Sequence, residues 1–142
     1  MNAEELRNWT RQFALKVVFL CRNFKDFPET KTIQYQLIKS STSVAANYRA
    51  ACRARSKNEW FSKISIVVEE IDETNFWLDF IQDLAIAPQK ELQNLLIESD
   101  RLMRIFSKAR ATAKRNKNNK PNLEEPLLEY SDIDLKFLFE EE

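Results

Sequence analysis

The chain contains no glycine and no histidine among its 142 residues. Dinucleotide-binding loops, phosphate-binding loops and nucleophile elbows all need glycine for tight turns and close backbone approach. Histidine is the usual base beside a serine or cysteine nucleophile and a frequent zinc ligand. Tight hairpin turns also favour glycine. The composition therefore argues against these classes of enzyme and against an all-β fold.

A long apolar run is also missing, since no stretch approaches the roughly 20 residues that span a bilayer. The first residues of the chain are polar and charged, unlike a secretory signal peptide. The two cysteines, Cys21 and Cys52, are too few for a disulfide scaffold and occupy apolar helical positions. We expect a cytoplasmic protein with reduced, buried, structural thiols and no membrane association.

Apolar residues recur at spacings of three and four along most of the chain. This periodicity predicts four helices, at about residues 3–25, 30–54, 56–84 and 88–114. Short connections between long helices favour antiparallel neighbours. The predicted fold class is therefore all-α: an antiparallel up-down-up-down four-helix bundle that occupies residues 1–117, followed by an irregular acidic C-terminal tail at residues 118–142.

Two helix starts carry capping signals. Thr30 follows the break at Pro28 and is a candidate N-cap of the second helix. Ser56 precedes Glu59 by three residues, which is the spacing of a capping box at the start of the third helix.

The third helix also carries a second apolar face near its end. At about 100° per residue, four side chains project roughly opposite the predicted core stripe. One buried face is enough for a helix of a four-helix bundle, so a second aromatic face suggests contact with another subunit. The alternative is that the C-terminal tail folds over it. The oligomer-interface candidates are Phe76, Trp77, Phe80 and Leu84.

Other polar clusters are interpreted as structural. The serines around Ser40, Ser41 and Ser43 can donate hydrogen bonds to the preceding turn of their own helix, so they need not be catalytic. The carboxylates of residues 69–83 point in several directions, and di-metal bundles combine carboxylates with histidine, which is absent here. Asn75 falls near the core stripe and is expected to make a buried hydrogen bond. We therefore assign no catalytic, cofactor-binding or metal-binding residue and predict that the protein is not an enzyme.

Charge is uneven along the chain although the formal net charge is zero. Residues 1–117 hold 20 Lys and Arg against 14 Asp and Glu, whereas residues 118–142 hold 2 against 8. Basic clusters of this kind can contact a phosphate backbone, or they can be ordinary solvated helix faces and helix ends. The nucleic-acid-binding candidates are Arg49, Arg53, Arg55, Lys57, Arg101, Arg104 and Lys108.

The segment of residues 118–142 combines two prolines, eight acids and many apolar residues. Acidic-apolar segments of this type commonly dock onto a surface. We hypothesise that it lies against a basic or aromatic groove of its own oligomer and competes there with external ligands.

One stretch resembles a known family. The sequence from Ser43 to Ala51 is SVAANYRAA, residues 53–60 read RARSKNEW, and residues 68–73 read VEEIDE. These segments resemble the small four-helix-bundle proteins encoded in intervening sequences of 23S ribosomal RNA, over about residues 6–115. The resemblance implies an antiparallel bundle that frequently assembles as a homopentamer. A related branch, the accessory variability determinant of diversity-generating retroelements, binds a reverse transcriptase and nucleic acid through a basic surface.

These observations lead to two hypotheses about function. The first is a non-enzymatic, homo-oligomeric helical scaffold that contacts RNA or a nucleoprotein through its basic residues, which would meet phosphates as point charges or forks. The second is a protein-binding adaptor that uses the aromatic face and the tail and binds no nucleic acid.

Overall fold

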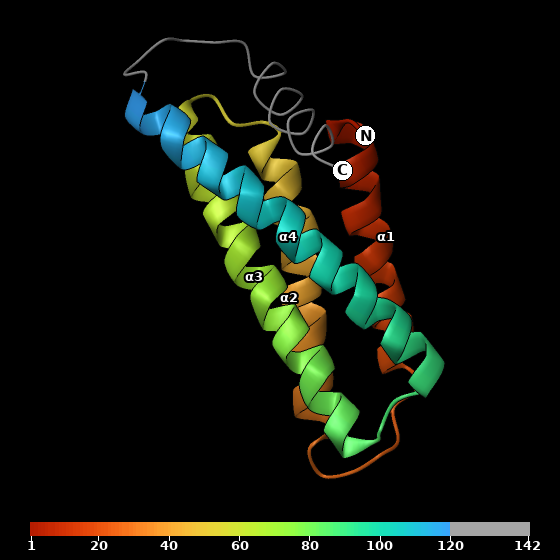
Figure 1. Ribbon diagram of the computed structural model, residues 1–142. Coiled ribbons are helices and arrows are strands. Elements are labelled where there is room, and N and C mark those ends of the chain that lie inside the picture. The colour runs from red at the N-terminus through yellow and green to blue at the C-terminus, as the bar shows by residue number, and fades with distance from the viewer. Residues whose placement is uncertain (120–142) are drawn as a thin grey trace.

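A computed structural model describes residues 1–119 of the chain, and this part contains four helices and no strand. The helices are α1 (Ala3–Cys21), α2 (Thr30–Ala51), α3 (Lys57–Leu84) and α4 (Gln89–Asn119). Figure 1 shows that α1 and α3 run in one direction and that α2 and α4 run in the other. The predicted all-α, up-down-up-down bundle is confirmed. The predicted acidic tail lies outside the described residues, and the domain division at residues 117 and 118 stays a prediction.

Contacts between the helices follow the chain around the bundle. Helix α2 packs most extensively on α3, α3 packs on α4, α1 packs on α2, and the α1–α4 contact is the smallest. Within residues 1–119, neither α1 with α3 nor α2 with α4 has Cα atoms within 8 Å of each other. Helices α2 and α4 are therefore diagonal partners, and their outer faces lie on opposite sides of the bundle.

The core consists of the apolar stripes predicted from the periodicity. Leu6, Phe13 and Val17 of α1 are fully buried, as are their counterparts on the other helices. Tyr48 is the largest of these side chains, and its ring packs against Trp60 and Phe106 at centroid distances of 6.5 and 5.2 Å. One continuous core therefore joins all four helices.

Helix α2 approaches α3 closely because small residues line its inner face. Ser40 and Ser41 are fully buried, and their hydroxyls donate to Leu37 O and Ile38 O in the preceding turn, as the sequence predicted. The Oγ1 atom of Thr74, on α3, lies 2.9 Å from Ser40 Oγ and 2.8 Å from Glu70 O. Asn75, which was expected to make a buried hydrogen bond, is only partly buried, and the fully buried polar side chain of α3 is Thr74.

Polar contacts fix α4 against its two neighbours. The indole N–H of Trp9 donates to Glu98 Oε1 at 3.0 Å, and Lys16 Nζ lies 3.0 Å from Glu98 Oε2. Further along α4, Arg110 Nε donates to Ser65 Oγ at 3.0 Å. The start of α4 therefore lies on α1, and its second half lies on the start of α3, as Figure 1 shows.

The helix ends test the two predicted caps. The Ser56 hydroxyl accepts the Glu59 N–H at 3.0 Å, so the predicted cap of α3 is confirmed. Thr30 is not the N-cap of α2: the N-cap position is Glu29, and no side chain bonds there. Instead, Thr30 Oγ1 accepts from Phe27 N and donates to Lys25 O, which holds the α1–α2 loop together. Helices α1 and α2 also end a turn earlier than predicted, at Cys21 and Ala51.

Helix α3 ends in a backbone conformation that normally requires glycine. Its C-cap, Ala85, has φ 55° and ψ 39°, the left-handed helical region, and its N–H bonds to Ile81 O. The Cβ of an L-residue is crowded in this region, which costs roughly 1–2 kcal/mol. A chain without glycine therefore carries strain at this turn.

We predict that Ala85→Gly stabilises the protein. Relief of the Cβ clash should raise the free energy of unfolding by about 1 kcal/mol, measured by urea denaturation. The control Ala111→Gly changes an exposed alanine inside α4 and should lower the same quantity by about 1 kcal/mol. If Ala85→Gly gave no gain, the strain at this turn would be disproved.

Candidate nucleic-acid interface

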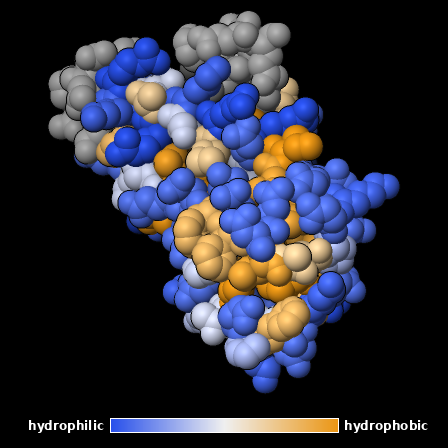
Figure 2. Space-filling view, turned by 60° about the horizontal axis from the view of Figure 1, so that its bottom comes forward, coloured by the Kyte–Doolittle hydropathy of each residue, from blue (hydrophilic) through white to orange (hydrophobic). Residues whose placement is uncertain are grey.

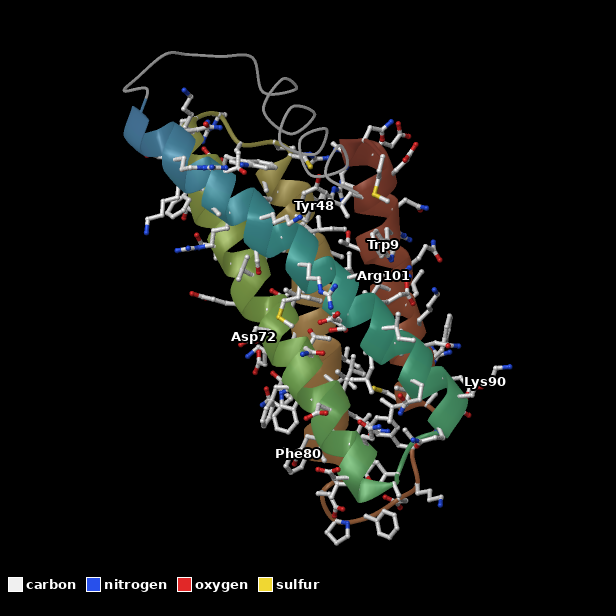
Figure 3. The ribbon with its side chains drawn as sticks, viewed as in Figure 1. Trp9, Tyr48, Asp72, Phe80, Lys90 and Arg101 are labelled. Atoms are coloured by element: carbon white, nitrogen blue, oxygen red, sulfur yellow. The ribbon has the colours of Figure 1, made fainter. Side chains whose placement is uncertain are left out.

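The structure divides the seven basic candidates between two sides of the bundle. Arg49 is exposed on the last turn of α2, and Arg53 is exposed just after that helix ends at Ala51. Arg101, Arg104 and Lys108 are exposed on α4, spaced by three and four residues along one face. Figure 3 shows Arg101 on α4, at the front of the bundle, with α2 behind. Because α2 and α4 are diagonal, the seven residues do not form one continuous site.

The remaining two candidates lie where α3 begins. Arg55 is exposed in the α2–α3 loop, and its Nε lies 3.8 Å from the Glu59 carboxylate. Lys57 is partly buried as the first residue of α3. On α4, Arg104 is paired with Asp100 at 2.7 Å. Since such exposed ion pairs are weak, a phosphate could replace either carboxylate at small cost.

A groove between α1 and α2 gives Arg49 two basic neighbours that the sequence analysis missed. The groove has a volume of about 570 Å³. Its rim carries Arg7 and Arg11 from α1 and Arg49 from α2, with one acid, Glu4. Small and aliphatic side chains of both helices form its floor: Ala14, Leu15, Val18, Ala45 and Ala46. This α1–α2 groove therefore combines an apolar floor with a cationic rim.

Arg7 is held in place by its surroundings. A side-chain hydrogen bond to Cys52 and the nearby Tyr48 and Glu4 raise the pKa of Arg7, against the opposing effect of partial burial. The Arg7 guanidinium is therefore charged and fixed at the end of the groove. Cys52 is half-buried and unpaired, while full burial raises the pKa of the Cys21 thiol to about 12. Both cysteines are free thiols, as predicted, but the prediction that both are buried holds only for Cys21.

A second hollow lies on the other side of Arg49, between α2 and α3. It has a volume of about 500 Å³ and is lined by Arg49 of α2, by Arg53 of the α2–α3 loop, and by Lys63 and Glu59 of α3. Arg49 and Ala46 belong to both hollows. We call the continuous set of Arg7, Arg11, Arg49, Arg53 and Lys63 the basic surface. Its α1 and α3 members were missed because only the packing of α1 and α3 on α2 brings them beside Arg49.

The predicted oligomer-interface residues form a cluster at the far end of α3. The rings of Phe76, Trp77 and Phe80 contact one another at centroid distances of 5.0 to 5.9 Å. Phe76 and Phe80 are 54% and 43% exposed, whereas Trp77 and Leu84 are partly buried against the core. Figure 3 shows Phe80 and Asp72 on the outer side of α3, and Figure 2 shows apolar residues gathered near this end of the bundle. We call Phe76, Trp77, Phe80 and Leu84 the aromatic surface.

The part of the sequence that carries the aromatic surface is acidic. Between residues 64 and 89 the chain has six Asp and Glu and no Lys or Arg. Burial, together with nearby Glu73 and Glu69, raises the pKa of Glu70, although Ser43 and Lys39 on α2 oppose this effect. Among residues 1–119, no three Asp, Glu or Cys side chains converge as a metal site would require. None of the described helices has a stretch long and apolar enough to cross a bilayer.

Comparison with known proteins gives one family and one related structure. The family model described as 23S rRNA-intervening sequence protein matches residues 4–108. No curated protein matches the sequence. A crystal structure of a protein of unknown function from the S23 ribosomal protein family of Bacteroides thetaiotaomicron is similar in fold, with a TM-score of 0.64 and 23% identity. The similarity covers 80% of this chain and 99% of that chain. With most of the bundle inside the family match, the chain belongs to the 23S rRNA-intervening sequence protein family.

Proposed function

We propose that the protein is a non-enzymatic, homo-oligomeric scaffold that binds the phosphate backbone of RNA, or of a nucleoprotein, through the basic surface. The observation that carries this proposal is the position of Arg49. It lines both hollows and so joins cations of three helices into one surface. Cations that neutralise several phosphates together release several counterions, which is the main source of sequence-independent affinity.

The basic surface is favoured over the stripe on α4 because its arginines border hollows, where a phosphate can be contacted from more than one helix. Arg101, Arg104 and Lys108 instead lie on one face of a single helix. We therefore propose that phosphate is contacted at the end of the bundle where α2 ends. Arg101, Arg104 and Lys108 of α4 are interpreted as an ordinary solvated helix face.

The proposal predicts a difference between two double variants of equal charge change. Arg49→Gln with Arg53→Gln should weaken binding to a structured RNA hairpin. It should also reduce the slope of log affinity against log salt by about 0.7–0.9 for each lost contact. Arg101→Gln with Arg104→Gln, on the opposite side, should leave both unchanged. Fluorescence anisotropy over a salt series measures both quantities.

Two results would contradict the proposal. One is equal loss in the two variants, which would mean that only net charge matters. The other is an absence of binding by the unmodified chain at low salt, which would assign the basic surface to solvation and favour the protein-adaptor hypothesis.

For the assembly of the scaffold, we assign the subunit contact to the aromatic surface. Phe76 and Phe80 expose apolar area beside Trp77, whose buried indole N–H has no hydrogen-bond partner among the described residues. Such a patch is costly in water unless it is covered. The same surface is the basis of the second candidate function, a protein-binding adaptor, in which a different protein covers it. The proposed homo-oligomeric scaffold includes the homopentamer that the family resemblance implies.

The mass of the protein in solution distinguishes between a second copy of the chain and a different protein as the partner that covers the aromatic surface. We expect light scattering to give a multiple of the 16.8 kDa chain, and Phe76→Ser to lower that multiple. Phe19→Ser is the matched control, because Phe19 is 51% exposed, similar to Phe76, but belongs to the diagonal helix α1. If the unsubstituted chain is monomeric, the result favours the second candidate function, a protein-binding adaptor.

A further inference from the structure

The lining of the α1–α2 groove is complementary to a ligand that is both apolar and anionic. Its floor consists of Ala14, Leu15, Val18, Ala45 and Ala46, and Leu15 is 36% exposed there. A nucleic-acid backbone would satisfy the arginines of the rim but would leave this floor open to water. A peptide that alternates acids with large apolar residues would satisfy both.

The chain itself contains such a peptide. Residues 120–142 include eight acids against two lysines, and the stretch of residues 127–139 contains eight large apolar side chains. This segment lies beyond the family match, which ends at residue 108.

We propose that residues 127–139 of the same chain dock in the α1–α2 groove and cover the basic surface. Charge selects this groove over the other exposed apolar area of the bundle. The aromatic surface lies on the stretch of residues 64–89, which has six acids and no Lys or Arg, so it would repel the three acids of residues 127–139, Glu129, Asp132 and Asp134. The groove instead presents Arg7, Arg11 and Arg49 against one acid, Glu4.

The length of the segment permits this contact. Helix α4 ends, α2 ends and α1 begins at the same end of the bundle (Figure 1). Neighbouring helices are about 8–10 Å apart, so the path from α4 to the groove is on the order of 20 Å. Six or seven extended residues span that distance at about 3.3–3.6 Å each. The groove runs from Glu4 to Val18, about 21 Å at 1.5 Å per helical residue, and about six extended residues of the segment cover that length.

Docking of residues 127–139 in the α1–α2 groove regulates the binding of nucleic acid, and this part of the inference rests on the proposed function. Arg49 belongs to both the groove and the α2–α3 hollow. A segment paired with Arg49 would therefore compete with phosphate for it. Nucleic acid would have to displace the segment before it could use the whole basic surface.

Photo-crosslinking in the full chain tests the docking without any nucleic acid. Phe137→p-benzoylphenylalanine should crosslink on irradiation to residues of α1 or α2 that line the groove, identified by mass spectrometry. Adding Ala46→Glu places a like charge in the groove and should lower the crosslink yield by about tenfold or more. Adding Ala111→Glu, the same change at another exposed helical alanine, should leave the yield unchanged.

Each of the other outcomes overturns the proposal. Crosslinks to residues 72–84 would place the segment on the aromatic surface, and an absence of crosslinks to the bundle would show that it does not dock. Crosslinks between isotope-labelled and unlabelled chains would assign the segment to a neighbouring subunit. Because no nucleic acid is present, these results are independent of the proposed function. The regulatory part is tested separately: Glu129→Gln, Asp132→Asn and Asp134→Asn together should tighten RNA binding, and unchanged affinity would refute it.

Discussion

The close contact between α2 and α3 determines where every functional surface of this bundle lies. It depends on the fully buried Ser40, which is small enough for α3 to approach and whose hydroxyl meets Thr74 Oγ1 at 2.9 Å. The hydroxyls are satisfied by each other and by backbone carbonyls of their own helices, so the contact buries polar atoms at low cost. With this register fixed, the last turns of α2 face the first turns of α3, and Arg49, Arg53 and Lys63 meet.

The same antiparallel register separates two surfaces of opposite character. The basic surface occupies the end where α2 stops, whereas the aromatic surface and its acids occupy the end where α3 stops. A partner that carries phosphate is attracted to one end and repelled from the other. A scaffold of this kind can therefore assemble through its aromatic surface and keep its arginines available, because the two contacts do not overlap.

Local sequence signals predicted the helices, the core stripes and the Ser56 cap, because spacing along one helix decides them. Interactions between distant segments decided the rest. Thr30 has the chemistry of a cap, but its hydroxyl is used by the loop at Phe27 and Lys25. Arg7 and Arg11 could not be grouped with Arg49, because only the packing of α1 on α2 brings them together. The α4 arginines form a separate cluster, because the outer face of α4 lies on the opposite side of the bundle from that of α2.

The central claim is that the cations of α1, α2 and α3 form one phosphate-binding surface. The most direct measurement is ultraviolet crosslinking of the full-length chain to a structured RNA, with the attachment sites located by mass spectrometry. The account predicts attachment in peptides that contain Arg7, Arg11, Arg49, Arg53 or Lys63. Attachment confined to residues 101–108 of α4, or an absence of attachment at low salt, would contradict it.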